Sequence, residues 1–528
     1  MTVAATALSS LPEPALEGVG ALLLGTLLAR LLRRRGMHWS WAAAGLATAI
    51  LLRRWLGGHA PAVEAALAVA ALRGRQGHRG DLEAGHDLAR AARARGTPLA
   101  ALRSVGAERL RGCSARARRR ARRQVTQTLL LGRRLDGRAV RIPFEPGGGG
   151  HALVLGATGS GKTVTQTLLA VSAIAQGRAA IVVDPKGDAR MREQLRGAAG
   201  RAGRRFVSWS PSGPDAYNPY ARGGETEIAD RLLAGERFTE PHYLRQAQRY
   251  LGHAIRALRA CELEVSLAAV VELLDAPQLE QLLRRAPPEV ATAGHAYLDS
   301  LTPRQLRDLA GVRDRLAILA ESELGPWLAG SEGDGRRSFD LLEVARSGSV
   351  AYLALESDSR PLLARMLAAA IVQDLQSAVA ELQGRPVPTL VVIDEFSAVS
   401  AEHVVALFGR ARSAGLTIVL GTQELADLRL PGQERTLERL VGNLSLLIAH
   451  RQVVPASAEL LSRLGGSRGA WRVSWSGAGR RTRARIEEPR LAEQELTELA
   501  PGSAAVIAFG SRQPSCVVRI SNVGGEER

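Results

Sequence analysis

The residues with the clearest chemical meaning lie in one glycine-rich turn, Gly156-Ala-Thr-Gly-Ser-Gly-Lys162-Thr163. An apolar run at 151–155 precedes the turn and predicts a strand, and the run at 164–175 predicts a helix. Glycines let backbone N–H groups approach phosphate oxygens, and a helix N-terminus adds positive potential. The lysine can reach the β- and γ-phosphates, and the threonine hydroxyl can bind Mg²⁺. The turn is a Walker A motif, which predicts that ATP binds Gly156, Ala157, Thr158, Gly159, Ser160, Gly161, Lys162 and Thr163.

A second motif, Leu390-Val-Val-Ile-Asp394-Glu395, is an apolar run that ends in two carboxylates. A buried strand ending in aspartate is the Walker B arrangement, in which Asp394 holds the magnesium ion through water. Glu395 beside it can take a proton from the attacking water as a general base. Acidic pairs after apolar strands are common, so this motif gains its meaning from the first. Together the two favour an ATP-hydrolysing motor over a small GTPase or a kinase.

Polar residues follow the next two predicted strands. Gln423 comes after the run 416–420, where its amide could sense the γ-phosphate or orient water; a plain strand-end glutamine is the alternative. Arg412 precedes that run, and Arg451 follows the run 444–449. In a ring of subunits such arginines can reach a neighbour's ATP and stabilise transition-state charge. Ordinary surface arginine remains an alternative for both.

Lysine is almost absent from this chain. The 70 basic residues include only Lys162 and Lys186. Lysine is a compact point charge on a slim stem, whereas arginine is a broad planar fork, so the two do not exchange freely in a phosphate cradle. Lys186 lies in Asp184-Pro-Lys-Gly-Asp188, after the predicted strand 180–183, where α/β proteins place ligands. We therefore predict that Lys186 also contacts ATP.

The net charge of +18 is concentrated near the N-terminus. Residues 1–150 contain 25 arginines and 9 acidic residues, whereas the remaining 378 contain 45 basic and 43 acidic residues. Six of these arginines lie within 116–123. Such a segment can bind anionic lipid head groups or nucleic acid, and a solvated helix face is the alternative.

Two uncharged apolar runs, 18–29 and 36–52, predict membrane helices within residues 1–56. Their similar lengths favour a two-span hairpin. That hairpin would place Arg33, Arg34 and Arg35 outside, against the positive-inside tendency. A single span at 15–32 with an interfacial second segment obeys the tendency, and helices buried in a soluble protein are a third reading. Residues 57–125 are rich in alanine and arginine and predict a basic helical juxtamembrane region.

From residue 126 onward the pattern predicts an α/β fold with a largely parallel sheet, because strand-like runs alternate with helical ones. Residues 222–334 interrupt the alternation with helical periodicity and no convincing strand. We predict an ATPase domain formed by 126–221 and 335–528, with an all-helical domain inserted at 222–334.

These residues together resemble the conjugative coupling proteins of the TraD/TraG type, within the HerA/FtsK-like motor ATPases. The matching segments span about residues 126–528: 151–163, 184–188, Asn218-Pro219, Ser338-Phe-Asp340, 390–395, and Arg412 through Gln423. The resemblance implies a RecA-like P-loop ATPase core that uses ATP and Mg²⁺, an inserted helical domain and N-terminal membrane helices. In that family the arginine about eleven residues before the strand-end glutamine acts between subunits, and Arg412 occupies that place.

The resemblance also implies a role. Such proteins form a hexameric ring at the inner (cytoplasmic) membrane, with the ATPase domain in the cytoplasm. They recruit DNA with its relaxase proteins and pump the DNA towards the channel of a type IV secretion system. The short apolar runs and the absence of a long tail after the motor are departures from that pattern.

Three alternatives stay open: a DNA translocase of the same superfamily, a secretion-channel ATPase that acts on protein, and a docking protein without hydrolysis. An ABC transporter subunit is disfavoured, because residues 383–388 contain no Ser-Gly-Gly signature before the second motif. The intact Lys162, Asp394 and Glu395 count against a docking protein.

Overall fold

The computed structural model describes most of the chain, in these segments: 13–34, 40–56, 59–83, 128–134, 136–143, 150–236, 238, 240–330, 336–395, 401–428, 436–475, 481–510 and 513–522. The chain divides into two compact units, which we describe separately. The smaller comprises residues 1–124 and 467–488, and the larger comprises 125–466 and 489–528. The predicted arginine cluster at 116–123 lies outside the described residues.

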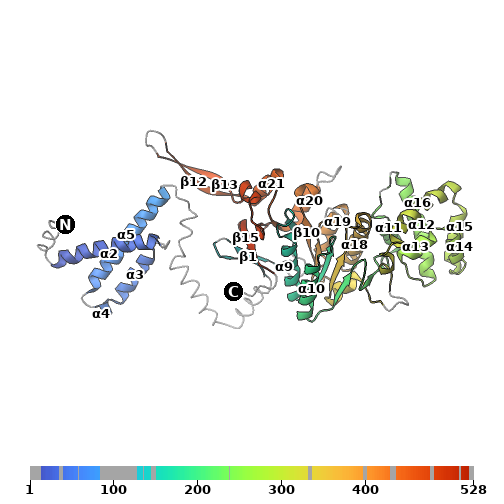
Figure 1. Ribbon diagram of the computed structural model, residues 1–528, viewed down its shortest axis with the longest axis horizontal. Coiled ribbons are helices and arrows are strands. Elements are labelled where there is room, and N and C mark those ends of the chain that lie inside the picture. The colour runs from blue at the N-terminus through green and yellow to red at the C-terminus, as the bar shows by residue number, and fades with distance from the viewer. Residues whose placement is uncertain are drawn as a thin grey trace. The chain divides into compact units, whose positions relative to one another are not determined.

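The larger unit is built on an eleven-stranded sheet with the order β2-β1-β15-β14-β11-β3-β10-β9-β4-β8-β5 (Figure 1). The strands from β11 to β5 are parallel, and β14, β15, β1 and β2 continue the sheet with antiparallel pairing. The parallel strands are β3 (His151–Leu155), β4 (Ala179–Asp184), β5 (Phe206–Trp209), β8 (Val350–Ala354), β9 (Thr389–Ile393), β10 (Leu416–Thr422) and β11 (Leu444–Ala449). The others are β1 (Thr128–Arg134), β2 (Ala139–Pro143), β14 (Ser503–Ala508) and β15 (Cys516–Ile520). The predicted mixed α/β fold with a mostly parallel sheet is confirmed.

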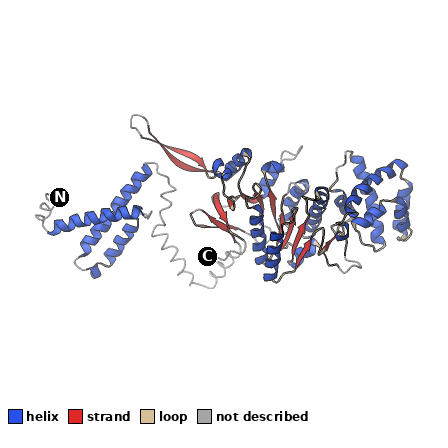
Figure 2. Ribbon diagram, in the orientation of Figure 1, coloured by secondary structure: helices blue, strands red, loops and turns tan. Residues whose placement is uncertain are grey.

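Helices cover both faces of this sheet (Figure 2). Alternate strand residues point to opposite faces, so Ala180 and Val182 pack into one hydrophobic cluster while Ile181 and Val183 pack into the other. The first cluster includes α9 (Lys162–Ala175) and α10 (Ala189–Arg201). The second includes residues of α17 (Leu341–Ser347), α18 (Pro361–Glu381), α19 (Ala401–Ala411), η5 (Leu425–Leu428), α20 (Thr436–Asn443), α21 (Pro455–Gly465) and α22 (Glu493–Thr497). Strands buried on both faces explain the continuous apolar runs in the sequence.

Helix α18 is the one helix in the described part of the chain that is long and apolar enough to cross a membrane. Its apolar window is 67% buried, and residues such as Leu367, Ile371 and Leu375 belong to the second cluster. Burial against the sheet therefore accounts for its composition.

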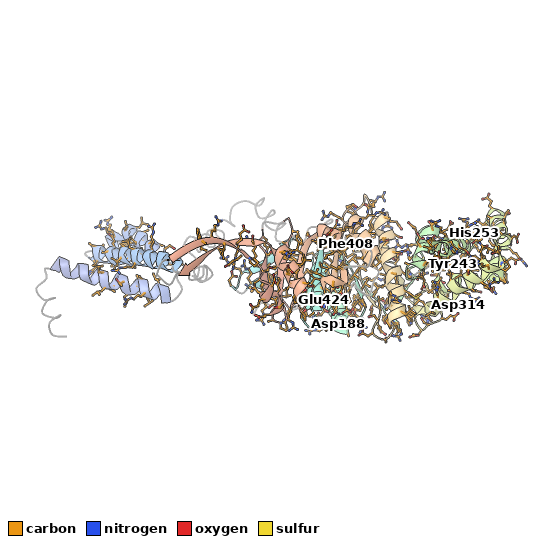
Figure 3. The ribbon with its side chains drawn as sticks, turned by 90° about the horizontal axis from the view of Figure 1, so that it is seen from above. Asp188, Tyr243, His253, Asp314, Phe408 and Glu424 are labelled. Atoms are coloured by element: carbon orange, nitrogen blue, oxygen red, sulfur yellow. The ribbon has the colours of Figure 1, made fainter. Side chains whose placement is uncertain are left out.

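Between β6 (Ala216–Tyr217) and β7 (Ser338–Phe339) the described residues form helices only, and this insert lies at one end of the larger unit (Figure 1). Its elements are α11 (Glu225–Leu233), α12 (Pro241–Ala260), α13 (Leu267–Leu273), α14 (Ala276–Leu283), α15 (Pro288–Asp299), α16 (Pro303–Ala320) and η3 (Gly325–Trp327). Local sequence explains two of these starts, since the side chains of Ser266 and Thr302 cap α13 and α16. Figure 3 labels Tyr243, His253 and Asp314 in this insert. The predicted domain limits stay predictions.

The entrance and exit of the insert are joined to each other. β6 pairs with β7 in parallel, and the rings of Tyr217 and Phe339 stack at 5.3 Å. Beside them the buried carboxylate of Asp374, on α18, accepts a hydrogen bond from the Tyr217 hydroxyl at 2.7 Å and pairs with Arg222 and Arg231. Two guanidinium groups and a hydroxyl together satisfy this buried charge. The insert is thus fixed to a core helix at its base.

The smaller unit contains α2 (Glu13–Arg34), α3 (Ser40–Leu51), α4 (Arg53–Leu56) and α5 (Ala60–Glu83), together with β12 (Ser467–Trp475) and β13 (Arg481–Pro489). α5 packs against both α2 and α3. The first apolar run of the sequence, 18–29, lies within α2, and α3 covers residues 40–51 of the second. Six strands carry no pattern that predicted them from the sequence: β12 and β13 here, and β5, β6, β7 and β15 in the larger unit.

Candidate nucleotide site

The glycine-rich turn lies between a fully buried strand, β3, and the start of α9 at Lys162. Gly156, Gly159 and Gly161 have φ values of 154°, 74° and 113°, in the region that favours glycine. A Cβ atom at Gly156 would also lie 2.6 Å from the Cβ of His450. Glycine is therefore required here both by the backbone conformation and by the close packing. The result is an open turn at the N-terminus of a helix, which is an anion-binding geometry.

Lys162 is directed back across this turn. Its Nζ donates a hydrogen bond to the carbonyl oxygen of Gly156 at 2.6 Å, and the residue is 8% exposed. Burial lowers the pKa of this lysine, against the opposing effect of the Asp394 and Glu395 carboxylates. A desolvated ammonium interacts more strongly with an incoming anion than a hydrated one does. Ser160 closes the turn, since its hydroxyl donates to the carbonyl oxygen of Ala157 at 2.6 Å.

The second motif meets the first through Asp394. The carboxylate follows the buried strand β9, is 6% exposed, and accepts hydrogen bonds at Oδ1 from Gln166 Nε2 at 3.0 Å and from the Glu395 N–H at 2.9 Å. Gln166 lies on α9, one turn after Lys162. Burial raises the pKa of Asp394 above its usual range, and the hydrogen bond from Gln166 opposes that shift. The phosphate turn and the acidic pair thus form one site.

Glu395 joins two further strand ends. Its carboxylate forms an ion pair with Lys186, which follows β4, and accepts a hydrogen bond from Gln423 Nε2, after β10, at 3.2 Å. The hydrogen bond to Glu395 raises the pKa of Lys186, so this lysine stays charged. β4, β9 and β10 are parallel neighbours, so their carboxyl ends meet at one edge of the sheet. The structure therefore brings Lys186, Glu395 and Gln423 together.

The acids beside Lys186 accept hydrogen bonds from the backbone of its turn and of the helix that follows. Asp184 accepts hydrogen bonds from the N–H groups of Lys186 and Asp188, at 2.9 and 2.7 Å. Tyr352 on β8 donates its hydroxyl to Asp184 at 2.6 Å. Asp188, labelled in Figure 3, caps α10 by accepting from the N–H groups of Arg190 and Met191. These hydrogen bonds hold the turn that carries Lys186.

The two predicted arginines lie in different places. The carbonyl oxygen of Arg451 accepts from the Ala157 N–H at 3.1 Å, so Arg451 borders the phosphate turn, and its Nε is buried without a hydrogen-bond partner among the described residues. Arg412 is exposed and precedes β10, at the amino ends of the parallel strands. A strand of this length extends about 20 Å at roughly 3.3 Å per residue. Arg412 is therefore on the opposite edge of the sheet from the phosphate turn of its own chain.

Two buried histidines, which no motif in the sequence marks, support the site. His450 accepts from the Thr165 hydroxyl at 2.8 Å through Nε2 and donates to the Ser503 carbonyl oxygen at 3.0 Å through Nδ1. His151 donates to the Phe408 carbonyl oxygen at 2.9 Å and accepts from the Ile418 N–H at 3.1 Å. Figure 3 labels Phe408, whose ring packs on His151. Burial lowers the pKa of each histidine to about 4, so both are neutral.

This neutrality predicts acid sensitivity. The unfolded chain binds these two protons below its ordinary pKa of about 6.5, whereas the folded chain binds them only near pH 4. Stability contributed by the neutral histidines is therefore present above pH 6.5 and is lost as the pH falls towards 4, by about 2–3 kcal/mol for each. Thermal unfolding between pH 7 and 4.5 measures the loss. His151→Gln and His450→Gln should each flatten the pH dependence, and the exposed His242→Gln should leave it unchanged; equal slopes in all variants would contradict this assignment.

Comparison with known proteins places the site in a family. A family model described as the type IV secretion-system coupling protein DNA-binding domain matches residues 140–495, more than half of the chain. The chain belongs to the type IV secretion-system coupling proteins. The predicted family is confirmed, and with it the role of this coupling protein in linking DNA to a secretion system. A search of curated protein sequences finds no match.

Solved structures resemble this coupling protein in fold. The bacterial conjugative coupling protein TrwBdeltaN70, in an unbound form, has 19% identity and a TM-score of 0.54, and the match covers 70% of this chain and 84% of that one. The plasmid coupling protein TrwB in complex with ADP and Mg²⁺ has 19% identity and a TM-score of 0.53, with 70% and 85% covered. Its complex with the non-hydrolysable ATP analogue ADPNP has a TM-score of 0.51 at 19% identity, with the same coverage. The large mixed sheet of this chain is thus a RecA-like fold of the TrwB kind.

Proposed function

We propose that this coupling protein hydrolyses ATP at the edge of the sheet where β3, β9 and β10 end, and uses the energy to move DNA into a type IV secretion channel. The hydrogen bond between Gln166 and Asp394 carries the proposal, because it joins the helix of the phosphate turn to the acidic pair at 3.0 Å. The family to which the chain belongs and the nucleotides named for the TrwB structures support it.

The residues present suit ATP with Mg²⁺. Thr163, on the first turn of α9, and Asp394 offer oxygen atoms, which magnesium prefers. No group of three or more His, Cys, Asp or Glu that could hold a metal by itself occurs in the described part of the chain, which suits a magnesium ion held largely by phosphates and water. Bound magnesium neutralises developing phosphate charge. The proposed phosphate ligands are the backbone of Gly156–Thr163 together with Lys162 and Lys186.

The proposed reaction is the attack of water on the γ-phosphorus. Glu395 accepts a proton from that water while the water oxygen forms a bond to the γ-phosphorus. The bond between the γ-phosphorus and the oxygen that bridges it to the β-phosphate breaks, which releases ADP and phosphate. Gln423 donates to the Glu395 carboxylate and so fixes its direction. Lys162 and Lys186 supply positive charge where the negative charge of the transition state grows.

The test is ATP hydrolysis by the purified full-length protein, with and without DNA. We expect DNA to stimulate turnover. Turnover that is indifferent to DNA would favour an ATPase that acts on protein, and no turnover under any condition would favour a docking protein. Relaxase proteins and channel components are the proposed partners in the cell, and a plasmid transfer assay with a deletion of this protein tests that part.

Anchoring in the inner membrane, with the ATPase in the cytoplasm, is part of the proposal. Large apolar side chains of the smaller unit are exposed by about half or more, an arrangement that suits contact with lipid. They are Leu22, Leu23, Leu24, Leu27, Leu31, Ile50, Leu51, Leu52 and Trp55. Whether α2 and α3 form two spans or one span with an interfacial segment is a topology question that reporter fusions after residues 35 and 57 answer.

We also propose a ring of subunits, of six by resemblance to the family, in which Arg412 of one subunit reaches the ATP of the next. Its place on the far edge of its own sheet, exposed to solvent, supports action on another chain. Arg451 borders its own phosphate turn, so we propose that it acts within its subunit.

Arg412→Ala should reduce turnover of the assembled protein about 10³-fold or more, in the range found for arginine fingers. The same change should leave the low turnover of dilute, unassembled subunits unaltered. Hydrolysis measured against protein concentration, with Arg410→Ala as an exposed control on α19, makes the comparison. An equal loss at all concentrations would show that Arg412 acts within its own chain.

A further inference from the structure

Gln166 is the one residue of α9 that hydrogen-bonds to the acidic pair among the described contacts, and it is not a nucleotide ligand by motif. It lies four residues after Lys162 and three after Thr163, so all three share one face of the helix. Gln166 is fully buried. Removing an amide group from water costs free energy, and an apolar residue in the same place would avoid that cost. A buried glutamine at this position therefore suggests a function for its amide.

We infer that Gln166 is a positioning residue that aims the Asp394 carboxylate at the magnesium site. A carboxylate only accepts hydrogen bonds, so the amide nitrogen of Gln166 must face Asp394 Oδ1. The Glu395 N–H ends on the same oxygen. Both hydrogen bonds that the described residues make to this carboxylate thus end on Oδ1. Oδ2 would then be the oxygen that accepts a hydrogen bond from a water bound to magnesium.

This arrangement lowers the stability of the fold, because it leaves the amide oxygen of Gln166 without a partner in the described part of the chain. Gln166 Oε1 is buried and has no hydrogen-bond partner among the described residues. An unsatisfied buried acceptor destabilises a protein by about 1–3 kcal/mol. The side chain therefore contributes less to folding than a buried apolar residue would, and its contribution lies in the hydrogen bond to Asp394.

Gly421 makes the contact possible. It lies in β10, between β3 and β9, where a Cβ atom would be 2.0 Å from Gln166 Nε2 and 2.3 Å from Asp394 Oδ1. Only a residue without a side chain leaves room for the amide and the carboxylate to meet there. The hydrogen bond thus depends on three elements: α9 carries Gln166, β9 leads into Asp394, and β10 provides the space at Gly421.

The inference rests on the proposed function, and its test reads magnesium binding and not turnover. Binding of a fluorescent ADP analogue to the full-length protein is measured in EDTA and over a series of Mg²⁺ concentrations. Gln166→Met keeps the volume and removes the amide. It should leave binding in EDTA within about twofold and raise the Mg²⁺ midpoint about 10- to 100-fold, the usual effect of losing a residue that orients a metal ligand.

Two further variants separate positioning from folding. Gln166→Asn keeps an amide that is one methylene too short, and Gly421→Ala displaces the pair without altering Gln166; both should raise the Mg²⁺ midpoint. Gln176→Met, at the exposed residue that follows the C-terminal end of α9, should not. An unchanged midpoint in Gln166→Met, or a loss of EDTA binding equal to the loss with Mg²⁺, overturns the inference. Failure of DNA to stimulate wild-type turnover would instead count against the proposed function, and the magnesium measurement would be unaffected.

Discussion

Lys162→Ala should reduce ATP hydrolysis about 10³-fold, the upper range for removing one electrostatic contact to a transition state, which corresponds to about 4 kcal/mol. The lysine is buried and its Nζ lies 2.6 Å from the Gly156 carbonyl oxygen, so alanine removes the ammonium group from the phosphate turn, while Lys186 remains paired with Glu395. Lys162→Arg should fail almost as completely, because a planar guanidinium does not fit the space of an ammonium.

The fold should survive this change. Burial lowers the pKa of Lys162, which means that the folded chain holds this charge at a cost. Replacing it with alanine removes that cost, so the thermal midpoint should stay the same or rise. Arg201→Ala, at the exposed end of α10, is the matched control and should retain full turnover. Activity in Lys162→Ala near that of wild type would mean that ATP binds elsewhere.

The sequence predicts one site from the two Walker motifs, and the structure brings the two motifs together, because the features that define each motif are local. Gly156, Gly159 and Gly161 determine the conformation of the phosphate turn. Asp394 directly follows the buried strand β9, so its place at the end of that strand can be read from the apolar run alone. Lys186 was found by its rarity, and the structure places it against Glu395. Asp184 and Asp188, on either side of it, accept backbone hydrogen bonds from the turn and from the start of α10.

The missed residues depend on contacts between distant segments. Gln166 has no motif, and its role follows only from the order of β3, β10 and β9 in the sheet. His450 and Thr165 are 285 residues apart, and their hydrogen bond is a product of the parallel pairing of β11 with β3. Short strands such as β6 and β7 carry too few residues for periodicity to show, so their pairing could not be read from the sequence.

Position relative to the sheet also changes the meaning of Arg412. In the sequence it is close to Gln423, yet the two residues lie at opposite ends of β10. A helix that returns the chain between parallel strands necessarily begins at their carboxyl ends and finishes at their amino ends. The geometry thus places Arg412 away from the phosphate turn of its own chain, which supports the proposal that it acts on a neighbouring subunit.

Glu395→Gln should give a protein that binds ATP and hydrolyses it about 10²- to 10⁴-fold more slowly, the contribution of a general base. A glutamine has no basic carboxylate for the proton of water, but its carbonyl oxygen still accepts hydrogen bonds from Lys186 and Gln423. The ion pair with Lys186 is 43% exposed on the lysine side, so its loss should cost at most about 1 kcal/mol. This variant should therefore retain ATP binding and lose most of its rate of hydrolysis.

The measurement is a single-turnover experiment with bound ATP, in which the variant retains unhydrolysed nucleotide after wild type has converted it. Glu193→Gln, at an exposed carboxylate on α10, is the control for the loss of one negative charge. Weak ATP binding in Glu395→Gln would show that the carboxylate is needed to hold Lys186 in place, which is a structural role. Undiminished hydrolysis would remove Glu395 from the reaction and leave the activation of water to another group at the edge formed by β4, β9 and β10.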